Sequence, residues 1–523
     1  MSLESSIGDA SIKQSLEQFL IVLSVSLSVA TVSRIFSWFR QIPYTLLLVI
    51  VGAGLAFVDI RLVNLSPELI LEIFLPPLLF EAAWNIRWRS LKDNLLPVSL
   101  FAIVGVIISV IGIAYPLSYF TNLSLPTALL VGASLSATDP VSVVALFREL
   151  GAGKRLTILM EGESLFNDGV AVVAFSLLVA IPLGVQEFSA TNTILQFFIF
   201  VGVGIGIGSV IGFGISFLTQ RFDLPLVEQS LTLVSAYGTY LITEELGGSG
   251  VIGVVTVGII LGNFGSRIGM NPRTRLLVSE FWDFLAFFVN SIVFLLIGDQ
   301  IYFGGLANNL DLIGVAIAAV LVTRIIVIFV LGNLSNIFTK QDINFREQTV
   351  LWWGGLRGSV SIALALSVPV TLSGRQEIID TVFGVVLFTL LVQGLTTKLF
   401  LEKLNLIGDQ PLRQKYSEAI ARRVALNRVL DYLEKNKELG LETDSEFLRY
   451  EQGLVRGQLN SVEEEIEKLI RQNPQLRSQN MEQLREELLD VEADTYAEFI
   501  RAGRLTKNLS PLLQEILSEA EKH

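Results

Sequence analysis

The sequence predicts an all-α polytopic membrane protein followed by a charged helical tail. Of its 523 residues, 51% are hydrophobic and only 17% are charged, and the mean hydropathy is +0.60. Soluble domains carry about 25% charged residues. The apolar residues fall into long runs, and about 20 apolar residues are enough for a helix to cross a bilayer. After about Lys403 the composition changes, because residues 410–523 are charged, helix-prone and without a run of membrane length.

The apolar runs predict about thirteen transmembrane spans. In chain order they are 17–37, 43–58, 67–86, 95–119, 126–147, 156–183, 193–219, 228–245, 249–264, 277–303, 311–338, 347–371 and 378–402. The expected domains are a polar N-terminal segment (1–16), a transmembrane domain (17–402) and a tail (403–523). For the tail, a solvated helical segment and a regulatory or partner-binding module both remain open.

Basic residues in alternate loops set the expected orientation. One set of loops holds Arg40; Arg87, Arg89 and Lys92; Arg148, Lys154 and Arg155; Arg221; Arg267, Arg273 and Arg275; and Lys340 and Arg346. The other set holds little beyond Arg61 and Arg375. The positive-inside rule assigns the first set to the cytoplasm. The N-terminus is then expected outside the cell and the tail in the cytoplasm, which an odd number of spans also requires.

Composition excludes several kinds of chemistry. The chain has no cysteine, and its single histidine is the last residue, His523. Thiol nucleophiles, disulfides and histidine-based catalytic or metal centres are therefore excluded. A net charge of −12 argues against a nucleic-acid partner. No span has a lysine in its interior that would activate a serine such as Ser164, so an intramembrane hydrolase is not favoured.

The stretch Gly162–Gly169 places acidic residues inside the sixth predicted span. A carboxylate at membrane depth costs about 2.5–3.5 kcal/mol on insertion scales, and such residues usually mark an ion path. On a helix, Ser164 and Asp168 share a face, and Glu163 and Asn167 form the adjacent stripe. This cluster of oxygen ligands suits a hard monovalent cation or a proton.

Two stretches predict broken helices at membrane depth. In Ala133–Ser142, Pro140 removes a backbone donor and disfavours helix at Asp139. In Gly354–Gly358, three glycines around Arg357 imply irregular backbone, which is tolerated only where it is buried or lines a cavity. Two breaks far apart in the chain fit the inverted-repeat plan of many transporters. Arg357 would offset the half-helix dipoles, or else extend to the cytoplasmic edge.

Two further charged residues belong to this set. Glu81, at the end of the third span, is expected to contribute to the ion site, and the alternative is an interfacial Glu paired with Arg87 or Arg89. Arg324 is the one charge inside the eleventh span, and a buried Arg needs an acidic partner. Glu163 is the expected partner.

The tenth span carries polar residues with more ordinary expected roles. Asn290 and Ser291 are expected to satisfy helix contacts rather than bind substrate. Asp299 falls near the outer end and is expected to be solvated.

Taken together, these segments resemble the cation:proton antiporter family, on the branch of bacterial NhaP and animal NHE sodium/proton exchangers. The matching pieces are Leu75–Glu81, Thr138-Asp139-Pro140 with Val141–Phe147, Gly162–Asp168 and Gly354–Gly358, in the family's order. The resemblance covers roughly residues 15–402 and does not extend to the tail. It implies thirteen helices, with a six-helix core (about 95–183 and 311–402), a dimerisation domain from the remaining spans, a homodimer and elevator-type alternating access.

The resemblance also implies roles for individual residues. Asp168 would be the carboxylate that carries Na⁺. The cation shell would be completed by Thr138 (partly through its backbone), Ser164, and Glu81 or Asp139 through water. Asn167 would link the crossed helices, and Glu163 with Arg324 would be a structural ion pair. Family members with Asn before the carrier Asp are generally electroneutral, whereas Thr138 departs from the small apolar residue common in animal members.

The expected function is secondary active exchange of Na⁺, and also Li⁺, for H⁺, electroneutral with 1:1 stoichiometry. Burial disfavours the charged form of Asp168, so proton and cation compete for one site. No enzymatic activity and no cofactor are expected. The expected partners are membrane lipid and a second copy of the chain, and the expected location is the plasma membrane. A K⁺/H⁺ antiporter of the same fold and a cation channel are the alternatives.

Overall fold

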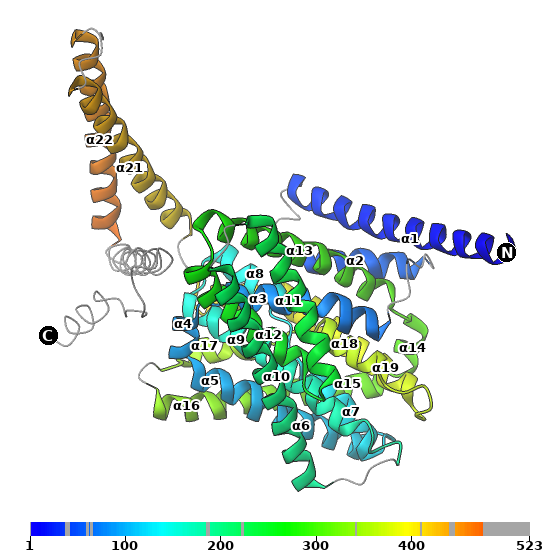
Figure 1. Cartoon of the computed structure of the whole chain (residues 1–523). Helices are drawn as coiled ribbons and strands as arrows, with labels where there is room; N and C mark the ends of the chain where they lie inside the picture. The colour runs from blue at the N-terminus through cyan, green and yellow to red at the C-terminus, as the bar shows by residue number, and fades with distance from the viewer. Residues whose placement is uncertain are drawn as a thin grey trace. The chain divides into compact units, whose positions relative to one another are not determined.

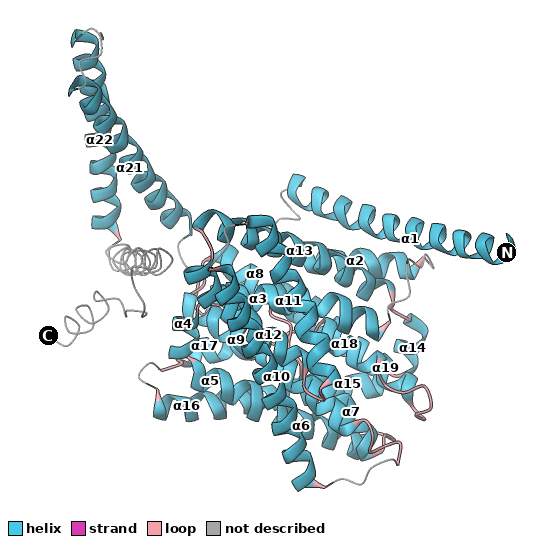
Figure 2. Cartoon of the chain, in the orientation of Figure 1, coloured by secondary structure: helices cyan, strands magenta, loops and turns pink. Residues whose placement is uncertain are grey.

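The computed structural model describes residues 2–36, 42–58, 62, 66–184, 189–220, 224–339, 342–407, 410–438 and 445–473. Within these residues the chain is helical and has no β-strand (Figure 2). The predicted all-α fold is therefore confirmed. The chain divides into two compact units, Met1–Leu406 and Ile407–His523.

The first unit is a bundle of α-helices (Figure 1). Short π-helical segments, written η, continue some of these helices. In chain order its elements are α1 (Ser2–Ile35), α2 (Tyr44–Phe57), η2 (Leu69–Phe74), α3 (Leu75–Asn85), α4 (Trp88–Asp93), α5 (Leu95–Ser99), η3 (Leu100–Val104), α6 (Gly105–Phe120), α7 (Leu125–Ser136), α8 (Val141–Leu150), α9 (Lys154–Leu178), α10 (Ala190–Thr219), α11 (Pro225–Glu245), α12 (Gly250–Ile260), η4 (Leu261–Gly269), α13 (Pro272–Asp299), α14 (Phe303–Asn308), α15 (Leu310–Ile326), η5 (Val327–Leu331), α16 (Gly332–Phe338), α17 (Phe345–Trp353), α18 (Ser359–Leu366), α19 (Arg375–Phe388), η6 (Thr389–Gly394) and α20 (Leu395–Lys403).

These helices overlap the predicted spans, with differences at the ends. Six stretches of the described chain are long and apolar enough to cross a membrane, and three shorter apolar helices accompany them. The count of thirteen spans stays a prediction. α1 begins at Ser2, well before the first predicted span. α9 ends at Leu178 because residues 179–184 turn and finish at Gly184, whose φ of +68° is in the left-handed region that favours glycine.

Two triplets of helical segments have the same layout, a continuous helix, a broken helix and a long helix. The first triplet is α5–α6, α7–α8 and α9, and the second is α15–α16, α17–α18 and α19–α20. If these helices cross a membrane as the predicted spans do, seven passes of the described chain lead from the start of the first triplet to the start of the second. Because seven is odd, the two triplets would then run in opposite directions, as an inverted repeat requires.

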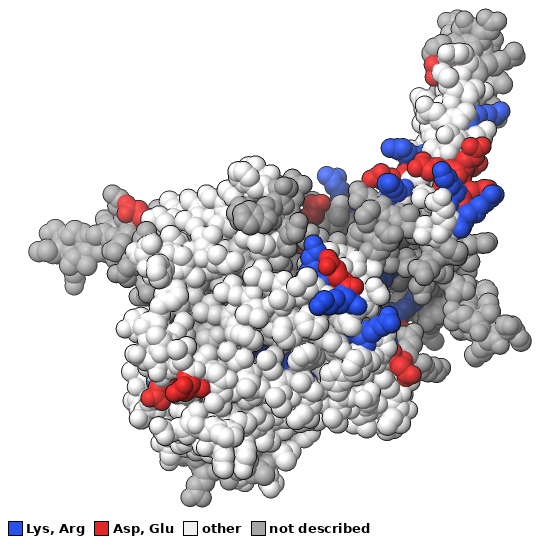
Figure 3. All heavy atoms as spheres, turned by 180° about the vertical axis from the view of Figure 1, so that it is seen from behind, with Lys and Arg blue, Asp and Glu red and all other residues white. Residues whose placement is uncertain are grey.

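The two triplets pack on each other and leave the other helices as a second group. α7 contacts α6, α9, α18 and α19, whereas α2 packs on α13, and α12 packs on α3 and α10. The face of the first unit seen in Figure 3 is largely uncharged, and its charged side chains gather in a few small groups. A broad uncharged surface of this kind suits contact with lipid.

Local sequence explains the first break. The Ser124 hydroxyl accepts a hydrogen bond from the Thr127 amide at 3.4 Å and so caps the start of α7. α7 ends at Ser136, and residues 137–140 are non-helical because Pro140 disfavours helix at the residue before it. α8 ends at Leu150, and the next residue, Gly151, has φ of +67°, which favours glycine after a helix.

The second break has an equally local origin. Asn344 and Glu347 form a capping box that starts α17. The helix ends at Trp353, and Gly355–Gly358 have no regular structure before α18 begins at Ser359. Both broken helices predicted from the sequence are therefore present.

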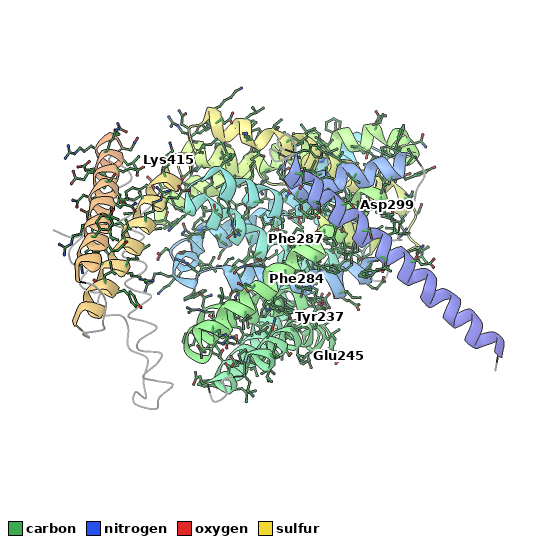
Figure 4. The ribbon with its side chains drawn as sticks, turned by 90° about the horizontal axis from the view of Figure 1, so that it is seen from above. Tyr237, Glu245, Phe284, Phe287, Asp299 and Lys415 are labelled. Carbon is green, nitrogen blue, oxygen red and sulfur yellow. The ribbon has the colours of Figure 1, made fainter. Side chains whose placement is uncertain are left out.

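The prediction that Asp299 is solvated is wrong. Asp299, labelled in Figure 4, ends α13, and its side chain is 0% exposed. Its Oδ2 atom accepts a hydrogen bond from the Leu62 amide at 3.1 Å. Leu62, beyond the end of α2, therefore lies against this end of α13, which the sequence alone did not indicate.

The second unit contains a helical hairpin in its described part. α21 (Gln410–Glu438) packs against α22 (Ser445–Gln472) around buried Tyr416, Ala419 and Ile466. The rest of the predicted tail, residues 474–523, lies outside the described residues.

Candidate cation-binding site

The two breaks touch through their backbones. The Asp139 amide, in the first break, donates to the Leu356 carbonyl, in the second, at 2.9 Å. Each break therefore satisfies a backbone group that the other leaves without a helical partner.

Glycines in the second break leave space for charged side chains. A Cβ atom on Gly358 would lie 2.5 Å from Cβ and 2.7 Å from Cγ of Asp139. A Cβ atom on Gly355 would lie 2.5 Å from Cζ of Arg324. Carbon atoms normally pack at about 3.5–4.0 Å, so neither position accommodates a side chain without movement. From the sequence, these glycines were expected to permit irregular backbone. The structure gives a second reason for glycine, because the backbone here lies close to the side chains of Asp139 and Arg324.

Three polar side chains hold the first break against α9. The Thr138 amide donates to Asn167 Oδ1 at 3.1 Å, and Asn167 Nδ2 donates to Thr138 Oγ1 at 2.6 Å. The hydroxyls of Thr138 and Ser164 are 2.9 Å apart and share a hydrogen bond. All three side chains are buried. Asn167 therefore ties the backbone and the hydroxyl of Thr138 to the helix that carries Asp168.

A cavity of about 470 Å³ opens beside this crossing. Thr138, Asp139, Asp168 and Glu81 all line it, so the structure brings four of the predicted ion-site residues together. Ser164 and Asn167 are not among the lining residues and lie behind Thr138.

Asp168 is the most buried of the cavity carboxylates. Its side chain is 8% exposed, and its Oδ1 atom has no hydrogen-bond partner within the described part of the chain. A buried carboxylate oxygen without a partner is costly unless a proton or a cation occupies the position. Asp139 differs, because its Oδ1 atom accepts from the Val141 amide at 2.9 Å, at the N-terminus of α8.

The cavity walls combine the two groups of helices. Leu75, Leu78 and Leu79 of α3 form an apolar side, with Ala286 and Phe287 of α13. Phe287 and its neighbour Phe284 are labelled in Figure 4. Glu81 accepts from Asn85 Nδ2 at 2.6 Å, rather than from the arginines expected in the interfacial alternative.

Arg357 lies buried at the crossing, with 1% of its surface exposed. Its Nη1 atom donates to the Ala137 carbonyl at 3.4 Å, and its backbone amide donates to Thr389 Oγ1 at 3.1 Å. The guanidinium is therefore directed at the carbonyl that follows α7, where a positive charge offsets the partial negative charge of a helix C-terminus.

Glu163 and Arg324 meet behind the cavity. Arg324 Nη1 donates to Glu163 Oε1 at 2.6 Å and Nη2 donates to Oε2 at 3.0 Å. Nη2 also donates to the Leu351 carbonyl at 3.0 Å, so the pair fastens α9 and α15 to the end of α17. The two side chains are 1% and 7% exposed, and neither lines the cavity.

Several residues of the site were not expected there from the sequence. Ser359 and Ser361 line the cavity, and Asn290 lines it although a helix contact was expected. Gln393 Nε2 donates to the Trp353 carbonyl at 3.1 Å, from the π-helical segment η6 that also carries Thr389. Gln393 could have been noticed in the sequence, because a side-chain amide inside a largely apolar span needs a hydrogen-bond partner.

The fold and the site together define a multi-pass integral membrane protein in which two crossed broken helices hold a buried carboxylate beside a cavity. The sequence profile described as "Sodium/hydrogen exchanger, transmembrane" matches residues 23–403. The chain belongs to this family.

Relatives cover the whole chain. The chain is 71% identical over 527 aligned residues, 100% of both chains, to the Na⁺/H⁺ antiporter ApNhaP of Aphanothece halophytica. It is 61% identical, over 97% of both chains, to the low-affinity Na⁺/H⁺ antiporter NhaS1 of Synechocystis sp.. Among solved structures, the sodium proton antiporter MjNhaP1 of Methanocaldococcus jannaschii matches with a TM-score of 0.59 and 22% identity, over 75% of this chain and 100% of that one. This likeness shows a shared fold.

Proposed function

We propose that this protein exchanges Na⁺ for H⁺ across a membrane, and also accepts Li⁺. The relatives that are 71% and 61% identical over nearly the full length carry the name Na⁺/H⁺ antiporter. The observation that carries the proposal is the unpartnered, buried Oδ1 atom of Asp168 on the wall of the cavity. One position that requires either a proton or a cation makes the two ligands competitors, which is the condition for exchange.

The proposed Na⁺ shell follows from the cavity lining. Asp168 and Thr138 provide direct oxygen ligands, and Glu81 or Asp139 contributes through water. Ser164 supports the shell by its hydrogen bond with the Thr138 hydroxyl, and rotation of its own hydroxyl toward the ion would make it a direct ligand. Oxygen ligands of this kind suit a hard cation.

The charges around the crossing support electroneutral 1:1 exchange. Asp139 and Asp168 carry one negative charge each when ionised, Arg357 carries one positive charge, and the Glu163–Arg324 pair is neutral. The sum is one negative charge when the site is empty and zero when it holds one Na⁺ or one H⁺. A charged site costs more free energy to move through a low-dielectric barrier than a neutral one. Only a site that holds Na⁺ or H⁺ would then move between the two sides of the membrane at a useful rate.

The movement that we propose is a shift of the two helix triplets (about 95–183 and 311–402) against the other helices, which would form the contact with a second copy in a homodimer. The boundary supports sliding because Gly169, next to Asp168, packs against the apolar side chains of Val251 and Ile252. A hydrogen bond across the boundary joins the hydroxyls of Thr45 and Ser142 at 2.5 Å. The cavity opens beside Arg148, on the side of the basic loops. We assign that side to the cytoplasm, with the N-terminus outside, in the plasma membrane.

The test uses purified protein in liposomes with an imposed pH gradient, a pH-sensitive dye, and the membrane potential clamped or free. Na⁺ and Li⁺ should dissipate the gradient independently of the potential. Dissipation by K⁺ alone would make the protein a K⁺/H⁺ antiporter, and a cation current without proton flux would make it a channel.

Asp168→Asn should abolish exchange while preserving expression and thermal stability. Asp311→Asn, an exposed aspartate in the first turn of α15, is the matched control and should retain exchange. A fully active Asp168→Asn protein would refute the proposed role of Asp168.

A further inference from the structure

A basic residue lies at the mouth of a cavity that is proposed to admit cations. Arg148, on α8, lines the cavity, and its Nη2 atom donates to Glu161 Oε1, on α9, at 2.7 Å. The two side chains are 63% and 20% exposed, so the pair is in contact with solvent. The exchange mechanism above gives Arg148 no role, and its charge repels an approaching Na⁺.

Three carboxylates line the same cavity as this guanidinium. Glu161 is on α9, Glu81 is on α3 and Asp283 is on α13, and all three line the cavity with Arg148. Asn85 joins two of them, because its Nδ2 atom donates to Glu81 at 2.6 Å and to Asp283 at 3.3 Å. Arg148 also interacts electrostatically with Glu81 across the cavity. These four side chains carry a net charge of −2 when ionised, and −3 without the arginine.

The positive charge of Arg148 and the negative charges of Glu81 and Asp283 therefore lie on opposite sides of the proposed boundary between the helix triplets and the other helices. Arg148 and Glu161 belong to the helix triplets, whereas Glu81 and Asp283 belong to the other group of helices. An exposed ion pair contributes only about 0–1 kcal/mol to stability. The Arg148–Glu161 pair therefore adds little to stability, and an effect on ions gives the position of Arg148 a role.

We propose that Arg148 determines the apparent affinity for Na⁺ by acting as a tethered cation at the entrance. Its guanidinium pairs with the Glu161 carboxylate and screens the charge of Glu81. An incoming Na⁺ must therefore compete with the guanidinium for the carboxylate oxygens of these two residues. This inference rests on the proposed Na⁺/H⁺ exchange and adds an affinity-determining residue to it.

The experiment measures initial rates of Na⁺-dependent proton flux in proteoliposomes against Na⁺ concentration. It is done at alkaline pH, because at acid pH the mouth would concentrate H⁺ as much as Na⁺ and the two effects would offset. Arg148→Gln should lower the KM for Na⁺ by about three- to tenfold with little change in maximal rate. Arg148→Lys keeps the charge and should retain the wild-type KM. Added choline chloride should shrink the difference between Arg148→Gln and wild type, because salt screens exposed charges.

Three further variants separate charge at the mouth from other effects. Glu161→Gln should raise the KM, because it frees Arg148 to engage Glu81. The double variant Arg148→Gln/Glu161→Gln restores the net charge and should return the KM toward wild type. Arg346→Gln removes an exposed charge from the same set of basic loops without altering the cavity lining, and it should leave the KM unchanged.

An unchanged KM in Arg148→Gln would overturn the proposal, as would Arg148→Lys behaving like Arg148→Gln. A lower maximal rate together with a lower melting temperature would also overturn it, since that result indicates a structural role. Absence of Na⁺-dependent flux in the unsubstituted protein would instead refute the proposed function, so the two failures are distinguishable.

Discussion

Replacing Gly358 by alanine tests whether the crossed breaks set the position of the site. The added Cβ atom would lie 2.5 Å from Cβ and 2.7 Å from Cγ of Asp139. Because carbon atoms pack at about 3.5–4.0 Å, one of the two breaks must move by about 1 Å. Overpacking of this kind costs about 1–3 kcal/mol, and a displacement of about 1 Å at a reacting centre can lower a rate by about 100-fold. We therefore expect exchange to fall by about two orders of magnitude while the protein still folds.

The assay is Na⁺-dependent proton flux in liposomes, with the melting temperature measured in parallel. Gly314→Ala is the matched control, because Gly314 lies on α15 of the same triplet and has nothing within 4 Å of the added atom. That control should keep full activity and gain up to about 1 kcal/mol from better helix propensity. A Gly358→Ala protein with wild-type flux and KM would refute the argument that close approach to Asp139 requires glycine there.

Three other substitutions probe contacts around the site. Glu163→Ala leaves a buried guanidinium without its partner and should destabilise the protein by about 3–5 kcal/mol; a normal melting temperature with a large rise in the KM for Na⁺ would count against a structural pair. Thr389→Val removes the acceptor of the Arg357 amide and should lower exchange with a changed KM, and Thr389→Ser should restore both. Thr397→Val is the control and should have little effect, because the buried Thr397 hydroxyl bonds the preceding turn at Gln393. Equal effects of the two valine substitutions would argue that the hydroxyl of Thr389 does not position the second break. Thr45→Val removes the hydroxyl bond across the boundary and should change the maximal rate more than the KM, and an unchanged rate would exclude a part for that bond in the movement.

The breaks and the buried charges could be predicted because their sequence signals are local and strong. Proline after Asp139 and three glycines around Arg357 disfavour helix at these two positions, and a charge inside an apolar span demands a partner. Glu163 was expected beside Arg324, and the two side chains do lie together. These inferences need no knowledge of the tertiary arrangement.

Other features depend on which helices become neighbours, and the sequence does not contain that information in a readable form. Asp299 is at a helix end, where exposure is the ordinary expectation, but it is buried and accepts a hydrogen bond from the Leu62 amide. Thr389 and Gln393 serve the second break from a different span, and a threonine in an apolar helix normally bonds its own preceding turn. Arg148 and Glu161 face each other because α8 and α9 form a hairpin whose turn geometry was not predicted.

The charge balance at the crossing has a consequence for cellular energetics. If a cycle moves one Na⁺ against one H⁺ and no net charge, the membrane potential does no work in it. Flux then stops when the ratio of Na⁺ concentrations across the membrane equals the ratio of H⁺ concentrations. A cell would extrude Na⁺ against its concentration gradient by this route only while its interior is more alkaline than its surroundings. In a medium so alkaline that the inside-to-outside ratio of H⁺ exceeds that of Na⁺, the same protein would carry Na⁺ inward.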